Sequence, residues 1–404
     1  MKIIIVWPNA FKFGWLGSTQ RYLMLERCLT DLGFEVILLA QAYENKKNQQ
    51  LLELESRARI ERTKYTNGGH VDSAIGNIKK ILLKLIMPKK FNRCISYGWA
   101  KKAKMILDVG EYKNISCVWS ISGGYLDAPV LGGAISEKLN IPHVLELHDP
   151  IVSVDIHGND EVQEKIFKEC LTSSKRIIVN TESYAEHLIS KYKLGLNSVS
   201  CIPQAYSGNT NYKKHNKTNF DGTKINVSYV GSLTGGRSLK FLTKLDKFLL
   251  EKVTLSLAGS GVGFNELITI IEEHELPLCF NYYGKISKDE ADELISKSDV
   301  SIIIQPTENS LEVPGKLFSI LSLGKPVLAL IDPNSETASI LRRSRLGYII
   351  DINSDSSSFI ENFVIRLFND LVEHKINPDF NYISSFSEQT FRKSVAELVK
   401  NHVN

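Results

Sequence analysis

Short apolar runs alternate along the chain with longer segments whose apolar positions recur at helical spacing. Uninterrupted apolar runs are typical of strands that are buried on both faces of a parallel sheet. In the first half, the pattern predicts strands at residues 2–7, 35–40, 116–120, 143–147, 176–180 and 198–202. The segments between them predict helices at residues 18–32, 127–139, 160–171 and 182–191. This alternation favours a doubly wound α/β fold.

The second half repeats the alternation. It predicts strands at residues 224–230, 253–258, 278–283, 299–305, 326–331 and 348–350. It predicts helices at residues 237–250, 265–274, 288–297, 314–323, 336–343, 356–370 and 388–402. Residues 206–223, rich in Asn, Lys, Gly and Thr, are typical of a linker.

We therefore expect two Rossmann-like domains, at residues 1–205 and 206–385, with residues 386–404 packing back on the first. Ligands of open parallel sheets bind at the carboxyl ends of the strands. We expect the chemistry there, facing a cleft that the two domains share.

Composition narrows the class of protein. Of 404 residues, 43% are hydrophobic and 23% are charged, which is ordinary for a globular protein and excludes collagen and long-range disorder. No apolar stretch approaches the roughly 20 residues of a membrane span. Residues 1–7 are typical of a strand rather than a signal peptide, and the six cysteines form no C-x-x-C pair. We expect a cytoplasmic protein with reduced thiols.

One segment is strongly basic. Residues 73–107 contain nine Lys or Arg and no Asp or Glu. Two interpretations of residues 78–90 stay open: an amphipathic helix on an anionic membrane surface, or a packed helix with a solvated basic face. The membrane contacts would be Lys79, Lys80, Lys84, Lys89 and Lys90. The segment lacks the interleaved aromatics of a nucleic-acid site, so we expect no nucleic-acid partner.

The strand at residues 224–230 leads into a candidate anion site. Gly231 and Ser232 follow the strand, Arg237 opens the predicted helix, and Lys240 lies one turn further on. Glycines at such a turn let backbone N–H groups approach an anion, and the Arg guanidinium adds a bidentate positive charge. An ordinary strand–helix turn with a surface Arg is the alternative.

A second candidate lies ahead of the helix that Pro314 opens. Glu312, Pro314 and Gly315 precede Lys316, which falls in the first turn, where the helix dipole disfavours a cation. An anion at the same helix end would explain this placement, and a lone surface Lys is the alternative. With Arg237, this arrangement would place two cations and two helix N-termini at one sheet edge, where they could hold a diphosphate leaving group.

In the first half, His148 and Asp149 follow the strand at residues 143–147. They fit either a site facing the cleft or a capping Asp beside a hydrogen-bonded His. Gly17 and Ser18 follow the first strand, where glycine lets the loop pass close to a ligand and serine can cap the helix.

Eight segments, in this order, resemble the motifs of one family. They are residues 17–18 with 32–36, 144–150 (VLELHDP), 176–182 (RIIVNTE), 201–204 (CIPQ), 229–237, 257–261, 283–286 and 314–329. Together they resemble the retaining glycosyltransferases of the GT-B fold, in the large family-4 group that builds bacterial surface polysaccharides. The resemblance covers nearly the whole chain.

The resemblance implies a metal-independent hexosyltransferase without a cofactor. It would move a sugar from a nucleotide-sugar donor, held by the second domain, to a glycan or lipid-linked acceptor on the first. The product would be capsule, O-antigen, exopolysaccharide or lipopolysaccharide. The catalytic set would be His148, Asp149, Arg237 and Lys316. The donor-binding set would be Gly17, Gly231, Ser232, Lys240, Gly259, Gly284, Lys285, Ile286, Glu312, Pro314, Gly315 and Ser319.

The chain departs from the family at one motif. Ser319 occupies the position of a Glu that grips the donor ribose, and Leu311 that of a Glu eight residues earlier. Glu308 and Glu312 lie nearby and would serve if the loop register shifts. A non-catalytic partner subunit therefore stays open. A sugar-nucleotide epimerase of the same fold also stays open, because the pair of His148 and Asp149 alone does not exclude it. A nicotinamide dehydrogenase is disfavoured, because residues 259–263 lack the third glycine of the dinucleotide fingerprint.

Overall fold

The computed structural model describes residues 1–10, 17–41, 56–63, 96–101, 103, 112–151, 160–206, 224–234, 236–354 and 357–403. The chain divides into two compact units. Unit 1 comprises Met1–Gln204 and Phe391–Asn404, and unit 2 comprises Ala205–Thr390. The basic residues at 79, 80, 84, 89 and 90, and residues 207–223 of the predicted linker, lie outside the described ranges.

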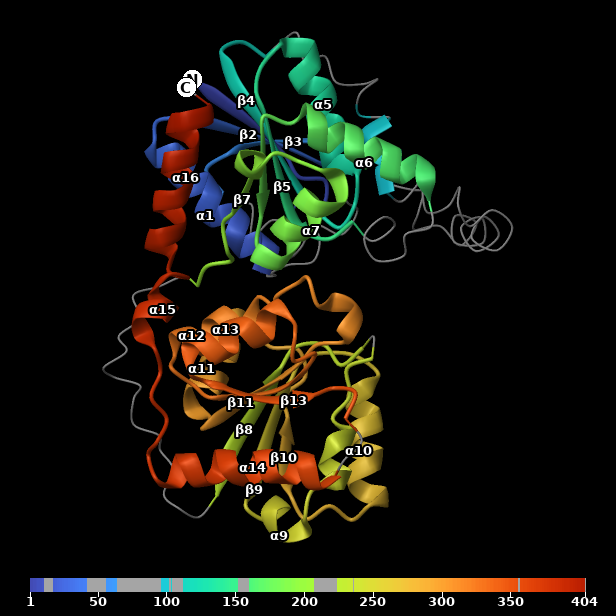
Figure 1. Ribbon diagram of the computed structural model, residues 1–404, viewed down its shortest axis with the longest axis vertical. Coiled ribbons are helices and arrows are strands. Elements are labelled where there is room, and N and C mark those ends of the chain that lie inside the picture. The colour runs from blue at the N-terminus through green and yellow to red at the C-terminus, as the bar shows by residue number, and fades with distance from the viewer. Residues whose placement is uncertain are drawn as a thin grey trace. The chain divides into compact units, whose positions relative to one another are not determined.

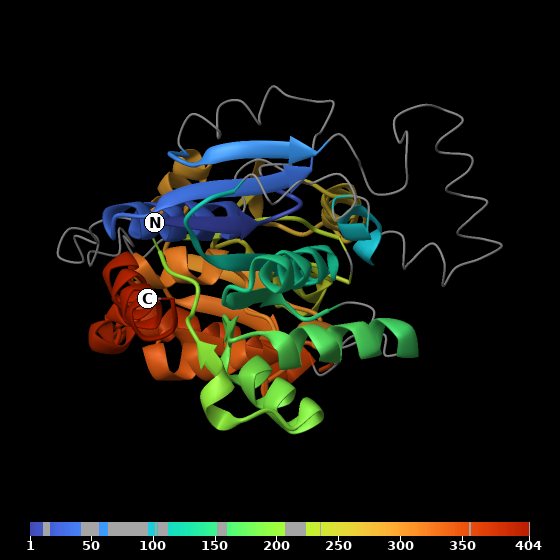
Figure 2. The same ribbon diagram turned by 90° about the horizontal axis from the view of Figure 1, so that it is seen from above.

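Unit 1 contains a parallel sheet of seven strands in the order β3-β2-β1-β4-β5-β6-β7 (Figure 1). The strands are β1 (Lys2–Val6), β2 (Glu35–Gln41), β3 (Arg59–Thr63), β4 (Ile115–Gly123), β5 (His143–Asp149), β6 (Arg176–Val179) and β7 (Val199–Cys201). In the central register, Ile4 of β1 pairs with Ile37 on one side and Val118 on the other. Figure 2 shows β3 beside β2 at one edge of the sheet.

The helices of unit 1 cover both faces of this sheet. They include α1 (Gly17–Asp31), α5 (Asp127–Leu139), α6 (Glu161–Ser173), α7 (Glu182–Tyr192) and most of α16 (Glu388–His402). Helix α16 lies along α1 (Figure 1), and the Cys28 thiol donates to the carbonyl of Arg392. On the opposite face, Ile4 and Val6 pack in one cluster with residues of α5.

Unit 2 contains a parallel sheet of six strands in the order β10-β9-β8-β11-β12-β13. The strands are β8 (Ile225–Val230), β9 (Val253–Ala258), β10 (Cys279–Tyr282), β11 (Val300–Ile304), β12 (Val327–Ile331) and β13 (Gly347–Asp351). The helices are α9 (Lys247–Leu250), α10 (Gly263–Glu273), α11 (Lys288–Lys297), α12 (Lys316–Ser322), α13 (Glu336–Ser344), α14 (Ser357–Val372) and α15 (Phe380–Ser384).

Alternate residues of β11 supply the cores on the two faces of the second sheet. Ile302 and Ile304 pack in a cluster that includes residues of α10 and α14, and Ile303 packs in a cluster with residues of α12 and α13. This alternation follows from the two-residue period of a strand, and it explains the uninterrupted apolar run in the sequence. The prediction of two doubly wound α/β sheets is confirmed.

The predicted helix at residues 237–250 is wrong. The segment instead forms a 3-10 helix at Lys240–Lys244 and the short helix α9. Leu239, Leu242 and Leu245 are buried at a spacing of three, which suits a 3-10 turn. Asp246 then accepts a hydrogen bond of 2.7 Å from the Phe248 N–H and starts α9. Arg237 therefore lies in a loop, and the expected helix N-terminus beside it is absent.

Both sheets reverse their strand order at one point, between β1 and β4 in unit 1 and between β8 and β11 in unit 2. Such a switch point lets the loops after two neighbouring strands diverge, and it is where open α/β sheets bind ligands. The candidate residues His148 and Asp149 lie near the first point, and Gly231 and Lys316 lie at the second.

Candidate functional site

In unit 2, backbone hydrogen bonds join the carboxyl ends of three strands. The Gly231 N–H donates to the carbonyl of Ala258 at 2.9 Å, and the Gly259 N–H donates to the carbonyl of Gly284 at 2.7 Å. The sequence-predicted glycines 231, 259 and 284 are thus brought together.

Gly259 cannot carry a side chain. Its φ of +143° is rarely adopted by other residues, and a Cβ atom there would lie 1.7 Å from the carbonyl oxygen of Gly231. Glycine is therefore required for the loops after β8 and β9 to approach this closely.

Lys316, the first residue of α12, reaches across to the end of β8. Its Nζ donates a hydrogen bond of 2.8 Å to the carbonyl oxygen of Val230 and lies 4.2 Å from the centre of the Tyr229 ring. A Cβ atom on Gly231 would lie 3.1 Å from the same ammonium group. The absence of a side chain at Gly231 therefore keeps one side of Lys316 open.

The electrostatic setting of Lys316 is unfavourable to its charge. Burial, and then the positive charge of Arg237, lower the pKa of Lys316 to about 7. Burial raises the pKa of Tyr229 to about 12, and Arg237 opposes that rise. The structure therefore brings Arg237 and Lys316 close enough for their charges to repel.

Among the described residues, no carboxylate balances these two cations. Within the described ranges, neither Lys316 nor Arg237 forms an ion pair with an Asp or Glu. The Arg237 guanidinium makes one hydrogen bond of 3.5 Å, to the carbonyl of Thr234. Two neighbouring cations without a protein counter-charge form a site for an anion of two or more negative charges.

The loop between β11 and α12 is held by the Gln305 side chain. The Gln305 amide donates to the carbonyls of Asn309 at 2.5 Å and of Glu312 at 2.8 Å, and Thr337 donates to its oxygen at 2.6 Å. The Glu312 carboxylate accepts from the Asn309 amide at 2.8 Å. In the structure, the Glu312 carboxylate thus makes a bond within its own loop.

The other predicted donor-binding residues lie around this edge of the sheet. Lys240 and Lys285 are exposed, as are Ser232 and Gly315, whereas Ile286, Pro314 and Ser319 are half-buried. Ser319 lies one turn into α12, and its carbonyl accepts from the Ser322 hydroxyl.

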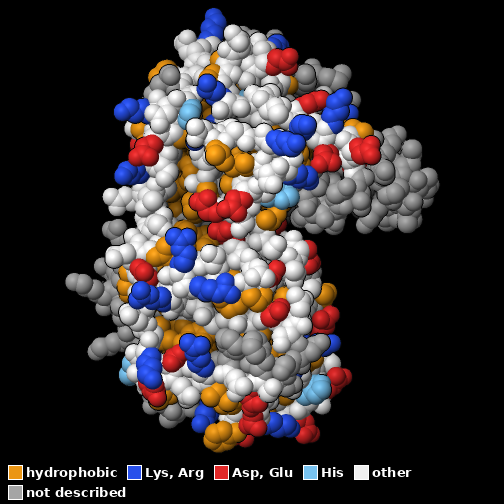
Figure 3. All heavy atoms as spheres, in the orientation of Figure 1, with side chains coloured by type: hydrophobic (Ala, Val, Ile, Leu, Met, Phe, Trp, Pro, Cys, Tyr) orange, Lys and Arg blue, Asp and Glu red, His pale blue; other side chains and the backbone are white. Residues whose placement is uncertain are grey.

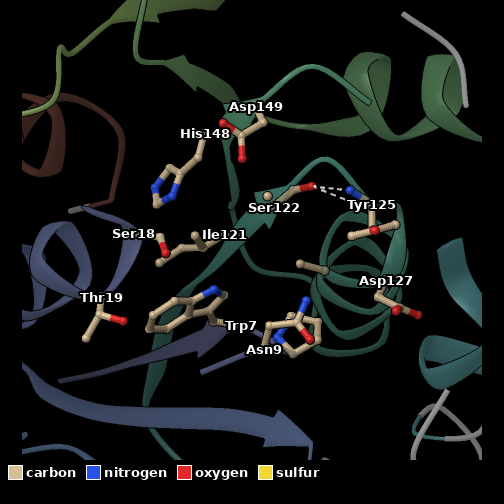
Figure 4. A pocket seen from close by; sticks show the side chains of 13 residues that line it. Trp7, Asn9, Ser18, Thr19, Ile121, Ser122, Tyr125, Asp127, His148 and Asp149 are labelled. Carbon is tan, nitrogen blue, oxygen red and sulfur yellow. Dashed lines mark hydrogen bonds between the residues drawn. The ribbon is translucent and has the colours of Figure 1, made fainter. Parts of the chain in front are cut away.

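Unit 1 contains a cavity of about 190 Å³ at its switch point. Figure 4 shows His148 and Asp149 at the end of β5, Ser122 from β4, and Trp7 and Asn9 from the end of β1 around it. The Ser122 hydroxyl donates to the carbonyl of Tyr125 at 2.5 Å, which fixes the loop into α5. The remaining lining residues are Pro8, Ser18, Thr19, Ile121, Gly123, Tyr125, Asp127 and Ala128.

A buried network of hydrogen-bonded side chains holds the His148 ring beside the cavity. Its Nε2 lies 2.9 Å from Oε1 of Glu146, which also accepts from Nε of Arg21 at 2.5 Å. The other Glu146 oxygen accepts from the Trp119 indole at 2.6 Å. Burial by itself would raise the pKa of Glu146, but Arg21 and His148 together hold it well below its usual range.

Asp149 has the opposite character. Burial raises the pKa of its carboxyl group, and the neighbouring His148 only partly offsets this rise. One of its oxygens lies beside Gly123, where a Cβ atom would be 3.5 Å away. Gly17, the first residue of α1, is exposed, and its carbonyl accepts from the Gln204 amide at 3.2 Å.

Sequence reasoning missed Glu146 and Arg21. Glu146 lies between two leucines of a fully buried strand, and Arg21 lies among buried apolar residues of α1. A charged residue inside each apolar run is the signal that could have found this pair, because charges are rarely buried unless they are paired.

Two kinds of feature are absent from the described residues. No described helix is long and apolar enough to cross a membrane. No group of three His, Cys, Asp or Glu side chains in the described part is arranged to hold a metal ion.

On the face in Figure 3, Lys and Arg are interspersed with Asp and Glu over the described surface of each unit.

Comparisons by sequence find no relative. No protein-family model matches the chain, and no curated protein matches it.

Solved structures do match, over nearly the whole length. Anabaena HepE, in complex with UDP and glucose, is 16% identical with a TM-score of 0.66 over 99% of this chain and 100% of its own. A glycosyltransferase from Rickettsia africae is 13% identical with a TM-score of 0.65, over 100% and 98%. The lipopolysaccharide outer core galactosyltransferase WaaB is 14% identical with a TM-score of 0.62, over 99% of each. These structures share the GT-B glycosyltransferase fold, and the chain has that fold.

Proposed function

We propose that the chain is a retaining hexosyltransferase that moves a sugar from a nucleotide-sugar donor to a glycan or lipid-linked acceptor. The observation that carries the proposal is the pair of cations at the end of β8. Lys316 and Arg237 lie close together without a carboxylate partner among the described residues, and the diphosphate of a nucleotide sugar is the anion that suits them.

The reaction then depends on charge stabilisation. The bond between the sugar C1 and the diphosphate breaks, its electron pair stays with the diphosphate, and the acceptor oxygen bonds to C1. Arg237 and Lys316 bind the charge that develops on the leaving group, which is the main contribution a preorganised site makes. Binding of the diphosphate raises the pKa of Lys316, so that the lysine is charged when the bond breaks.

The resemblance assigns the remaining roles. His148, with Asp149 beside it, faces the transferred sugar, and unit 1 binds the acceptor. The loop glycines at positions 231, 259 and 284 let the donor approach the backbone. The transfer needs no metal and no cofactor, and the protein acts in the cytoplasm on bacterial surface polysaccharide, with an anionic membrane surface as a further partner.

HepE is described in complex with UDP and with UDP-glucose, so uridine donors are the first to test. Thermal unfolding of the purified protein would be followed with UDP-, GDP- and ADP-sugars, with EDTA present. A ligand that binds only the folded state raises the unfolding temperature in proportion to its affinity. We expect one nucleotide class to stabilise the protein, and stabilisation by none of them would contradict the proposal.

One feature favours a second candidate function, a non-catalytic partner subunit. Ser319 offers a neutral hydroxyl where the resemblance expects a carboxylate, so the donor ribose loses a charge-assisted hydrogen bond. Release of free nucleotide from the stabilising donor distinguishes the candidates. Transfer or slow hydrolysis supports the enzyme, conversion to an epimeric nucleotide sugar indicates an epimerase, and binding without turnover indicates the subunit.

A further inference from the structure

The ring of His148 is held by a cluster of four side chains, Arg21, Trp119, Glu146 and His148, which we call the Glu146 cluster. Arg21, Glu146 and His148 are 1%, 1% and 5% exposed, and Trp119 is fully buried. Arg21 also donates to the carbonyl of Pro203 at 2.8 Å, and its guanidinium lies 4.9 Å from the centre of the Phe391 ring. The cluster is therefore fixed at both ends by the packing of unit 1.

The hydrogen-bond chemistry of this cluster requires a proton on the Nε2 atom of His148. The Arg21 guanidinium and the Trp119 indole can only donate, and each already donates to a different oxygen of Glu146. The Glu146 carboxylate is therefore an acceptor at both oxygens. The His148 Nε2, 2.9 Å from Oε1, must then carry the proton and donate.

The other ring nitrogen is left for a ligand. Within the described residues, Nδ1 of His148 makes no hydrogen bond, and His148 lines the cavity at the ends of β1 and β4. In a neutral ring whose Nε2 is protonated, Nδ1 carries a lone pair and accepts a hydrogen bond. The charged groups that act on the ring are Glu146 and Asp149, with Arg21 behind Glu146.

We propose that Arg21 and Glu146 are positioning residues that fix His148 as the Nε2–H tautomer, so that its Nδ1 accepts a hydrogen bond from a hydroxyl of the sugar in the cavity. The positive charge of Arg21 keeps the buried Glu146 carboxyl group ionised. The ionised carboxylate then holds the ring proton on Nε2 of His148. Only the identity of the ligand, a sugar hydroxyl, rests on the proposed function.

The tautomer can be measured directly by ¹⁵N NMR of protein labelled at its nine histidines. The spectrum of the His148→Gln variant identifies the signals of His148 by their loss. At a pH where the ring is neutral, we expect a single tautomer, with Nε2 protonated and Nδ1 unprotonated. A ring protonated at Nδ1, or an equal mixture of the two tautomers, overturns the proposal without reference to any activity.

Two variants then test the cause. Arg21→Met combined with Glu146→Gln removes the obligate donor that shares Oε1 with His148. The Gln oxygen then accepts from the Trp119 indole, so the amide N–H₂ faces Nε2 and favours the Nδ1–H tautomer. Trp119→Phe is the matched control, because it removes a partner of the other oxygen and leaves the carboxylate in place. We expect the tautomer to change in the first variant and not in the second. An unchanged tautomer in a folded Arg21→Met/Glu146→Gln protein overturns the proposal.

A double-mutant cycle separates positioning from general destabilisation. The Arg21→Met/Glu146→Gln variant should lower the transfer rate by roughly 10-fold, as for one lost hydrogen bond, without changing affinity for the nucleotide diphosphate. In the His148→Gln background it should cost nothing more, because its effect passes through the ring. A full additional loss there contradicts the inference. If no transfer is found at all, the proposed function fails, while the NMR result still decides the tautomer.

Discussion

The ammonium group of Lys316 donates a hydrogen bond of 2.8 Å to the carbonyl oxygen of Val230, the last residue of β8. Through this bond, the start of α12 is joined to the strand at the switch point of the second sheet. The bond also holds a partly buried cation at the place where Gly231 leaves the strand without a side chain. The charge of Lys316 is costly there, because burial and Arg237 both oppose it.

The affinity for a nucleoside diphosphate should fall as the pH rises above about 7. The pKa of Lys316 is lowered to about 7 without a ligand, and a bound diphosphate raises it, so binding takes up a proton in this range. One proton weakens binding by at most about tenfold for each pH unit. Calorimetric titrations from pH 7.5 to 9, in buffers of different ionisation enthalpy, measure this uptake.

Lys316→Met is the control for that effect. The variant should bind weakly at every pH and lose the proton uptake. A native protein whose affinity is constant from pH 7.5 to 9 would show that Lys316 does not titrate in contact with the ligand.

The same substitution should stabilise the protein when no ligand is present. The folded pKa of Lys316 lies below the value of about 10.5 in the unfolded chain, so the unfolded state binds more protons between pH 7 and 10.5. Native stability should rise with pH across that window, and the cost of the charge is greatest below pH 7. At pH 6 we expect Lys316→Met to unfold a few degrees higher, about the shift that 1 kcal/mol produces in a unit of this size. An unfolding temperature below that of the native protein would contradict this.

Arg237→Ala should lower turnover by roughly 100-fold or more, the scale of losing one preorganised donor to a developing charge. Among the described residues, the Arg237 side chain makes one hydrogen bond, of 3.5 Å, to the carbonyl of Thr234. We therefore expect the loop after β8 to keep its fold in the variant. Lys247→Ala is the matched control, since it removes an exposed cation from α9, which precedes β9. Steady-state kinetics, with the donor that stabilises the protein, compare the turnover of the two variants. Near-native turnover of a folded Arg237→Ala protein would remove Arg237 from the site.

Gly259→Ala should destabilise unit 2 by about 3 kcal/mol, from overpacking and backbone strain together. The new Cβ would lie 1.7 Å from the Gly231 carbonyl oxygen, so the loops after β8 and β9 must separate. Gly195→Ala, where a Cβ atom meets nothing within 4 Å, should change stability little. Chemical denaturation measures both. Equal stability of the two variants would show that the loops can move apart freely.

Most of the fold was predictable because both sheets are parallel. Buried strands appear as apolar runs, and amphipathic helices such as α11 and α5 begin and end at the predicted residues, 288–297 and 127–139. The strand β3 (Arg59–Thr63) was not predicted, because it lies at the sheet edge and its sequence is RIERT. Helix α15, five residues long, is too short to show a helical period.

The site was less predictable than the fold. The ends of strands identified Gly231, Lys316, His148 and Asp149, because those positions follow from strand order. Periodicity could not show that residues 240–244 form a 3-10 helix, since three buried leucines at a spacing of three also fit an α-helix. The pairing of two buried charges depends on tertiary contacts between α1 and β5, which no local pattern contains.

Calorimetric titration with UDP, GDP and ADP, each compared with its own nucleoside, measures how much of the binding affinity comes from the diphosphate. Lys316 and Arg237 would bind the diphosphate, and hydrogen bonds to charged groups contribute about 1.5–3 kcal/mol each. We therefore expect one diphosphate to bind at least about 100-fold more tightly than its nucleoside, and Lys316→Met and Arg237→Ala to reduce this preference. Equal affinity for nucleoside and diphosphate, or no binding of any diphosphate, would contradict this expectation.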